Sequence, residues 1–235
     1  MPNIEPPQCF YCNARLKSVF CELNPEEIQL LNSSKKHTVY KKGQVIFNEG
    51  VRPRGLFCVH EGKVKITQLG VDGKEQIIHL AKNGDILGYR AILSNDNYSC
   101  TATTIENSSL CFVPSNLFTG MVEKNPKLTF EILRLFSNEL KVAERNITDL
   151  AQKSVKERLA QSILLLKESY GFEKDSCTIN ITITREEIAS IVGTARETII
   201  RFLSELHKDK VIELTGKKIK IIQYQKLIMA ANIFD

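Results

Sequence analysis

The segment Thr184–Asp209, TREEIASIVGTARETIIRFLSELHKD, has the pattern of a helix, a tight turn and a second helix. Thr184 can accept a hydrogen bond from the backbone N–H three residues later, and Glu187 stands where the acid of a capping box belongs. Gly193 can end the first helix at positive φ, and Thr194 can cap the second. Apolar residues recur at helical spacing at Ile188, Ala189, Val192, Ile199, Phe202, Leu203 and Leu206. The segment is therefore predicted to be a helix-turn-helix.

The second helix of this motif carries a polar face made by Arg196, Glu197 and Arg201. An arginine can donate two hydrogen bonds to guanine, and a glutamate can accept one from the amino group of cytosine. The simpler interpretation is a solvated helix face with an ion pair between Glu197 and Arg201, which lie four residues apart. Because the turn glycine, the caps and the polar face occur together, we predict that these three residues contact DNA bases.

The composition is typical of a soluble globular protein and shows no catalytic signature. Of the 235 residues, 43% are hydrophobic and 25% charged, and the net charge of +5 suits an anionic partner. No apolar stretch is long enough to cross a membrane and no secretion signal is found at the N-terminus, so we expect a cytoplasmic protein. Phosphate-binding loops, dinucleotide fingerprints and Ser/His/Asp patterns are not found, so an enzyme is not expected.

Hydrophobic periodicity divides the chain into four predicted parts. Residues 1–22 form a cysteine-bearing leader, 23–123 a β-roll sensor domain, 124–151 a long dimerisation helix, and 152–235 a winged helix-turn-helix domain. Strands of the roll are predicted at Val45–Asn48, Leu56–His60, Val64–Gln68, Gln76–Leu80, Thr101–Ile105 and Leu110–Val113. Asp72-Gly73 between two of these strands is a strong hairpin signal. The predicted fold class is α+β, with a double-stranded, jelly-roll-like β-roll.

The long helix is predicted to begin at Asn125-Pro126, because proline is favoured in the first turn of a helix. Its apolar residues follow a heptad spacing, at Leu133, Phe136, Leu140, Ala143, Ile147 and Leu150. Such a stripe can pack on the protein's own β-roll or on the same helix of a second copy. We favour a parallel homodimer, because a helix-turn-helix protein usually needs two copies to read two half-sites. Residues 152–154 interrupt the stripe and are the expected hinge.

The last part of the chain adds elements on both sides of the helix-turn-helix. A helix over Val155–Tyr170 and a strand over Thr178–Thr184 are predicted before it. A hairpin wing with strands at Val211–Leu214 and Ile219–Ile222 is predicted after it. Contacts to DNA phosphates are predicted at Thr184, Thr194, Ser204, Lys217 and Lys218. Such contacts position a protein on DNA, whereas the base contacts specify the sequence.

The leader carries Cys9, Cys12 and Cys21 in a C-x2-C-x8-C pattern. A C-x2-C pair can bring two sulfurs to one metal, and it is also the spacing of a redox dithiol. A plainer interpretation is that these cysteines pack as small apolar residues. Since a reducing compartment keeps thiols free, a disulfide framework is not predicted. Core or strand positions are expected for Cys58, Cys100 and Cys177.

A β-roll, a long helix and a winged helix-turn-helix, in that order, resemble the CRP/FNR family of bacterial transcription regulators over nearly the whole chain. The most specific match is G-x-A-R-E-T-x-x-R, which begins at Gly193. The resemblance implies that Glu197 and Arg201 read the TGA core of each half-site. It also implies that Arg196, an arginine that FNR-type members lack at this place, contacts a further guanine. A homodimer that binds an inverted repeat of TGTGA-like half-sites and contacts RNA polymerase is therefore expected.

The resemblance argues against a cyclic nucleotide as the effector. Family members that bind cyclic AMP carry Gly-Glu-Leu followed by Arg-Ser in the roll. The matching places in this chain are Gly88-Tyr89-Arg90 and Ser99-Cys100. Because the glutamate for the ribose and the arginine for the phosphate are missing from those places, cyclic nucleotide binding is not expected.

FNR-type members hold an oxygen-labile [4Fe-4S] cluster on three N-terminal cysteines and one in the roll. By resemblance, the expected ligands are Cys9, Cys12, Cys21 and Cys111, and four thiolates suffice for a cluster. The last leader spacing is x8, however, longer than the x5 of FNR, and members without a cluster also bury a cysteine at the place of Cys111. A structural zinc ion and a thiol redox switch therefore stay open as alternatives.

The leading hypothesis is a DNA-binding transcription regulator controlled by a redox, oxygen, nitric oxide or small-molecule signal at its N-terminal domain. The alternative is a metal- or ligand-binding signalling module whose C-terminal domain docks a protein partner. The arginines of the second helix and the lysines of the wing favour DNA.

Overall fold

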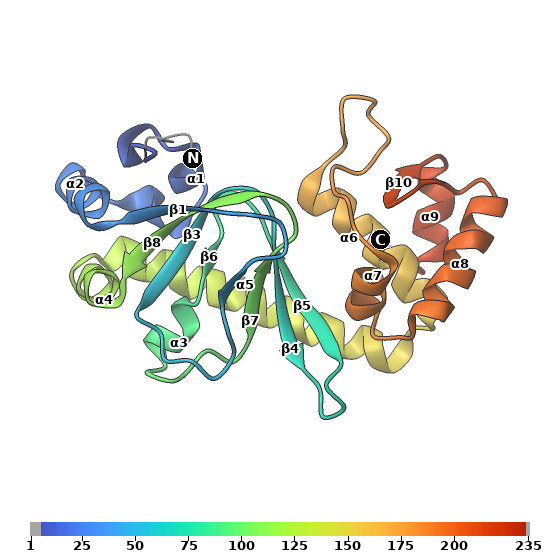
Figure 1. Cartoon of the computed structure of the whole chain (residues 1–235), viewed down its shortest axis with the longest axis horizontal. Coiled ribbons are helices and arrows are strands. Elements are labelled where there is room, and N and C mark those ends of the chain that lie inside the picture. The colour runs from blue at the N-terminus through green and yellow to red at the C-terminus, as the bar shows by residue number, and fades with distance from the viewer. Residues whose placement is uncertain (1–5, 234–235) are drawn as a thin grey trace. The chain divides into compact units, whose positions relative to one another are not determined.

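The computed structural model describes residues 6–233 and separates into two compact units (Figure 1). The first unit comprises the described residues up to Gly73 together with Ile78–Leu140. The second comprises Lys74–Ile77 and the described residues from Lys141 onward. The division falls within the long helix α5 (Pro126–Gln152), so each unit is described by itself. Within the described residues, no helix has both the length and the apolar character needed to span a bilayer.

Two four-stranded sheets form the β-roll, with the strand orders β1-β8-β3-β6 and β2-β7-β4-β5. The strands are β1 (Lys36–Tyr40), β2 (Val45–Phe47), β3 (Gly55–Glu61), β4 (Val64–Leu69), β5 (Glu75–Ala81), β6 (Ile86–Leu87), β7 (Thr101–Thr104) and β8 (Ser108–Pro114). The structure confirms all six predicted strands and the turn between β4 and β5, where the N–H of Gly73 donates to the carbonyl of Gly70 at 2.9 Å. Strands β1 and β6 are additional.

The two missed strands have weak sequence signals for physical reasons. The sequence of β1, KHTVY, is polar and only partly buried along its length, so it shows no clear apolar face. Strand β6 has two residues, too few to show any period, and its Leu87 pairs with Phe57 of β3. Both strands therefore depend on partners from distant parts of the chain.

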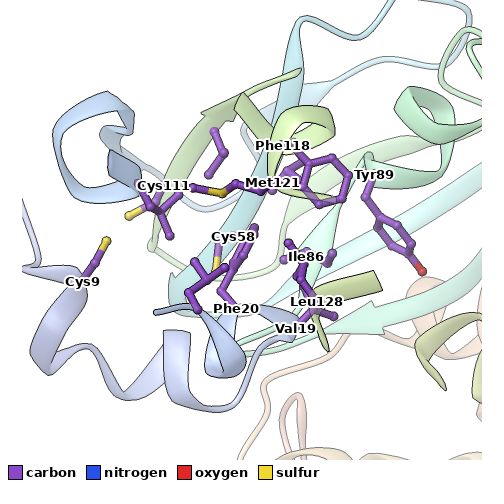
Figure 2. Packing of buried hydrophobic residues seen from close by; sticks show 14 of the residues in the cluster. Cys9, Val19, Phe20, Cys58, Ile86, Tyr89, Cys111, Phe118, Met121 and Leu128 are labelled. Atoms are coloured by element: carbon purple, nitrogen blue, oxygen red, sulfur yellow. The ribbon is translucent and has the colours of Figure 1, made fainter. Parts of the chain in front are cut away.

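Strand β3 divides the core of the roll into two layers, because successive side chains of a strand point to opposite faces. Leu56 and Cys58 join a cluster with Phe20, Phe118 and Leu128, which come from flanking helices (Figure 2). On the opposite face, Val59 joins the roll interior with buried residues from the other sheet. That second cluster also contains Phe47, Val64, Ile66, Ala81, Leu87, Ala91, Tyr98, Ala102 and Leu110.

Short helical segments lie before β1 and between the strands. They are η1 (Cys9–Tyr11), α1 (Asn13–Leu16), η2 (Val19–Glu22), α2 (Pro25–Ser34), α3 (Tyr89–Leu93) and α4 (Ser115–Lys124). Helix α2 begins with a capping box in which Asn24 and Glu27 satisfy each other's backbone N–H groups. The leader predicted for residues 1–22 is thus helical over much of its described part. The long helix α5 begins at Pro126, as predicted.

The second unit contains the C-terminal helices and a two-stranded hairpin. Its elements are α6 (Val155–Tyr170), α7 (Arg185–Val192), α8 (Arg196–Lys208), β9 (Ile212–Thr215), β10 (Lys218–Ile221) and α9 (Tyr224–Ala230). The break predicted at residues 152–154 is confirmed, because α5 ends at Gln152 and Ser154 caps α6 in a capping box with Glu157. The predicted wing is also confirmed as the hairpin β9–β10.

The prediction of a strand over residues 178–184 is wrong. This segment makes only isolated bridges, from Thr178 to Lys220 and from Ile179 to Phe172. The three isoleucines Ile179, Ile181 and Ile183 are buried, which explains the alternating pattern. The alternating pattern indicates an extended chain that is buried on one side. A β-strand also needs a hydrogen-bonded neighbouring strand along its whole length. The hairpin β9–β10 supplies backbone partners at only a few points.

Candidate nucleic-acid interface and cysteine site

The helix-turn-helix begins with the predicted capping box. The hydroxyl of Thr184 accepts from the N–H of Glu187 at 3.1 Å, and the carboxylate of Glu187 accepts from the N–H of Thr184 at 2.8 Å. Helix α7 ends at Gly193, whose backbone is left-handed with φ 71° and ψ 53°. A residue with a Cβ adopts this conformation only at a cost, so the glycine sets the turn between the two helices.

The predicted cap of the second helix is wrong by one residue. Ala195 is the N-cap of α8, and its side chain has no oxygen with which to cap the first turn. Thr194 belongs to the turn instead, where its N–H donates to the carbonyl of Ala189 at 3.1 Å. The turn after Gly193 is thus one residue longer than a direct cap by Thr194 allows, a detail of backbone geometry that the residue types do not reveal.

Helix α8 buries one face and exposes the other. Ile199, Leu203 and Leu206 are 2% exposed or less and pack in the second unit. Arg196, Glu197 and Arg201 are all exposed. Within the described chain, no ion pair links Glu197 to Arg201, and the guanidinium of Arg201 lies 4.8 Å from the ring centre of Phe202. The alternative of an intrahelical ion pair is therefore not what the structure shows.

The predicted phosphate contacts differ in how free their polar groups are. Lys217 is exposed at the tip of the wing. Lys218 pairs with Glu173 at 2.7 Å. The hydroxyl of Ser204 donates to the carbonyl of Ile200, and that of Thr184 donates to Glu187, both at 2.8 Å. Lys217 is thus the most accessible of the predicted contacts, whereas the others must exchange an internal partner or, for Thr194, emerge from a half-buried turn.

The predicted dimerisation stripe of α5 is largely exposed in the single chain. Exposed fractions are 56% for Leu133, 61% for Leu140, 68% for Ile147 and 54% for Leu150, and Ala143 is exposed as well. Phe136 differs, because its ring packs on Tyr89 of the roll with 5.4 Å between ring centres. Large exposed apolar residues in a row on one helix indicate a surface that another chain covers.

A layer of thiol and imidazole groups lies on one face of the sheet β1-β8-β3. Cys111 of β8 is the direct cross-strand partner of both Cys58 on β3 and His37 on β1. His60 follows Cys58 by two residues, and its ring centre lies 6.1 Å from that of His37. The Nε2 atom of His37 is buried without a hydrogen-bond partner in the described part of the chain.

The N-terminal segment covers this layer with two more thiols. Cys9 and Cys12, from η1 and the residue after it, line one small cavity together with Cys58 and Cys111. The Sγ atom of Cys12 lies 3.5 Å from Nδ1 of His60. The ammonium group of Lys35 lies 3.1 Å from Sγ of Cys9, so a cation stands beside the thiols. Figure 2 shows Cys9 on the N-terminal segment and Cys58 and Cys111 on the strands.

Cys21, the third predicted leader ligand, does not line this cavity. Burial raises the pKa of its thiol, and the charges that act on it belong to Glu22, Glu131 and Arg15. Cys58 is confirmed as a buried strand residue, as expected, and it also lines this cavity. Its spacing of two from His60 on a predicted strand was the available signal, but its pairing with Cys111 depends on the sheet register.

The four thiols lie close together but are not arranged as the ligands of one metal ion. Burial raises the pKa of Cys111 to about 11, and it raises the pKa of Cys58 even further because Cys111, Cys12 and Cys9 lie close by. Within residues 6–233, no three His, Cys, Asp or Glu side chains are arranged to hold one metal ion. The four thiols nevertheless share a cavity of about 20 Å³. They are thus clustered without forming a tetrahedral site for one ion.

The stretch that matches the cyclic-nucleotide phosphate site is occupied by internal contacts. Arg90 donates to the carboxylate of Glu139 through Nη2 at 2.6 Å and through Nε at 3.0 Å. Tyr98 is buried, stacks on Phe47 with 4.0 Å between ring centres, and donates to the carbonyl of Gly55 at 2.9 Å. These contacts pair the guanidinium of Arg90 with Glu139 and place the ring of Tyr98 in the core of the roll.

Two family models match the chain. The model of the cyclic nucleotide-binding domain covers residues 37–125, and that of the Crp-like helix-turn-helix domain covers residues 157–229. The fumarate and nitrate reduction regulatory protein of Vibrio cholerae is 30% identical over 229 residues, which cover 96% of this chain and 90% of that protein. The anaerobic regulatory protein of Pasteurella multocida is 32% identical, covering 94% and 81% respectively.

A solved structure shows the same architecture. A transcriptional regulator of the CRP/FNR family from Thermus thermophilus superposes with a TM-score of 0.71 and 25% identity, covering 84% of this chain and 99% of that one. The fold and the exposed face of α8 define a DNA-binding transcription regulator with a winged helix-turn-helix. The chain belongs to the CRP/FNR family. The predicted family and fold class are confirmed, and a regulator rather than an enzyme is the class to which its relatives belong.

Proposed function

We propose that the protein acts as a homodimer that binds an inverted repeat of TGTGA-like half-sites. The observation that carries this proposal is the exposed face of α8, where Arg196, Glu197 and Arg201 stand free of ion pairs in the described chain. Two arginines can each donate a pair of hydrogen bonds to a guanine, and the glutamate can accept from cytosine. The geometry of one recognition helix per chain supports two half-sites per dimer.

The exposed apolar stripe of α5 supports the dimer. Leu140, Ile147 and Leu150 are each more than half exposed on one long helix. A parallel pairing of two such helices would bury these residues in a coiled-coil seam, with roughly 25 cal/mol gained per Å² of apolar surface. The β-roll is then the sensor and the winged unit the DNA reader, and promoter-bound dimers would contact RNA polymerase through other surfaces.

We propose further that the signal acts at the thiols between the N-terminal segment and the roll. The shared cavity that Cys9, Cys12 and Cys111 line supports their assignment as ligands of an iron–sulfur cluster, which would supply an oxygen-sensitive redox centre when bound. The ammonium of Lys35 can offset the negative charge of the thiolates. Arg90 is held by Glu139, so the phosphate of a cyclic nucleotide finds no free cation there.

The test of the DNA proposal is titration of a labelled inverted repeat with the wild type and three variants. Arg201→Ala should lose about 1–3 kcal/mol of discrimination per half-site, because a bidentate contact to guanine is lost. Arg196→Ala should lose discrimination only at the outer guanine of TGTGA. Lys217→Ala is the matched control, because it should weaken binding to all DNA sequences alike. It should also reduce the slope of log affinity against log salt concentration by about 1.

Three outcomes would contradict the proposal. Unchanged sequence preference in Arg201→Ala would show that α8 does not read the bases. A wild type that prefers half-sites without the outer guanine would show that Arg196 does not specify it. A monomer by sedimentation at the concentrations of the titration would contradict the proposed pairing of α5.

A further inference from the structure

The cysteine site has one more buried thiol than the leader and Cys111 account for. Cys58 of β3 and Cys111 of β8 are direct partners across two hydrogen-bonded strands, and both are less than 10% exposed. Directly opposite residues of an antiparallel pair point to the same face of the sheet with Cβ atoms about 5 Å apart. The sheet therefore presents two thiols side by side toward the N-terminal segment.

The N-terminal segment supplies the other two thiols of the set. Cys9 and Cys12 stand over the sheet and line the same cavity as Cys58 and Cys111. Arg15, itself buried, holds this segment by donating to the carbonyls of Cys9 at 2.8 Å and Phe20 at 2.9 Å. Two thiols from a C-x2-C turn thus face two thiols from adjacent strands.

The charges around the cavity suit a group ligated by thiolates. Lys35 lies beside Cys9, with 3.1 Å between its ammonium nitrogen and the Sγ atom. Arg15 lines the cavity as well. Buried thiolates are stable only when cations or a metal centre compensate their charge. In the described chain, neither Arg15 nor Lys35 forms an ion pair with an acidic side chain. Both positive charges therefore remain available to the site.

Cys21 is placed differently. It lies in η2 and does not line the cavity. The carbonyl of Cys21 accepts from Arg15 at 3.4 Å, so its backbone helps to anchor the segment.

We propose that Cys58 is the fourth cysteine ligand, with Cys9, Cys12 and Cys111, and that Cys21 is not a ligand. The inference rests on the iron–sulfur part of the proposed function and deepens it by assigning the ligands. A cavity of about 20 Å³ has room for little more than one water, so loading must displace the short segment that carries Cys9 and Cys12. Cys58 and Cys111 stay in place because their strands are paired within the sheet.

The test is anaerobic reconstitution of the full chain with ferrous iron and sulfide, followed by iron and sulfide analysis and the visible spectrum. Cys58→Ala and Cys111→Ala should each bind at least tenfold less iron than the wild type. Cys21→Ala should bind as much iron as the wild type, and Cys100→Ala is a further control in the same roll. Cys58→Ser keeps the volume of the buried side chain, and circular dichroism shows whether each variant is folded.

The outcomes separate this inference from the proposed function. Folded Cys58→Ser or Cys58→Ala with a wild-type iron content would overturn the assignment of Cys58. Loss of iron in folded Cys21→Ala would restore Cys21 as the ligand. A wild type that binds no iron would overturn both the inference and the iron–sulfur proposal, while sequence-specific binding to the inverted repeat would still support the DNA-reading function.

Discussion

The carboxylate of Glu139 on α5 accepts a hydrogen bond from the hydroxyl of Tyr89 at 2.5 Å. Tyr89 is 3% exposed, and Arg90 donates to the same carboxylate oxygen. Burial and the neighbouring carboxylate together raise the pKa of Tyr89 well above its ordinary value. This contact joins the long helix to the short helix α3 of the roll, within the first unit.

Removing this carboxylate should destabilise the first unit. Glu139→Ala leaves the buried Tyr89 hydroxyl without its partner, which should cost about 1–2 kcal/mol and lower Tm by roughly 3–6 °C. Tyr89→Phe should cost a similar amount, and the double variant little more than Glu139→Ala alone, because Glu139→Ala already removes the hydrogen bond of Tyr89. Glu144→Ala, an exposed acid on the same helix, is the control for thermal unfolding and should change Tm little. If the stability losses of Glu139→Ala and Tyr89→Phe simply added in the double variant, the proposed interaction between the two side chains would be contradicted.

The same chemical change should have opposite effects at two glycines. Gly193→Ala places a Cβ at φ 71° and should cost about 1–2 kcal/mol in unfolding free energy. Gly120→Ala lies inside helix α4 with open space around its added Cβ, and it should stabilise by about 0.5–1 kcal/mol. Urea denaturation measures both. Equal effects of the two changes would show that the turn conformation at Gly193 is not strained for alanine.

The two threonines of the helix-turn-helix should differ in stability. Thr184→Ala removes the capping box of α7 and should cost about 1 kcal/mol. Thr194→Ala should cost less than half of that, because Ala195 is the N-cap of α8 and no cap bond is lost. Chemical denaturation of the two variants decides between the observed cap and the one that the sequence predicts. A larger loss in Thr194→Ala would place the cap at Thr194 after all.

The turn around Asp175 should respond to acid. Its carboxylate accepts from the hydroxyl of Thr178 at 2.5 Å, from the N–H of Thr178 at 2.9 Å and from the N–H of Cys177 at 3.1 Å. These hydrogen bonds hold the pKa of Asp175 well below its usual range. Because the folded pKa is lowered, the stabilisation is present above the ordinary aspartate pKa of about 3.9 and is lost as pH falls through the lowered value.

Asp175→Ala should therefore be less stable than the wild type at pH 7, and the difference should shrink as pH falls below about 4. Urea denaturation at several pH values measures the difference. Asp209→Ala is the control, since Asp209 is exposed and its side chain makes no hydrogen bond in the described chain. A difference that stays constant down to the lowest accessible pH would show that the carboxylate charge does not stabilise the turn.

Local signals in the sequence were enough to predict the elements of the winged helix-turn-helix and most strands of the roll. The capping box at Thr184, the turn at Gly193 and the hairpin at Asp72-Gly73 depend on neighbours within a few residues, so residue types reveal them. The apolar faces of α5 and α8 follow from the helical period for the same reason. The exposure of Arg196, Glu197 and Arg201 on α8 likewise follows from their position opposite the apolar stripe.

The tertiary structure decided which residues from distant segments share a site. The pairing of Cys58 with Cys111 depends on the register of β3 against β8, 53 positions apart in the numbering of the chain. A register shifted by one residue would turn either thiol to the opposite face. The isoleucines of residues 178–184 illustrate the converse, because their alternation indicated burial but not a strand partner. Spacing in the leader favoured Cys21, whereas the packed sheet brings Cys58 to the cavity that Cys9, Cys12 and Cys111 line.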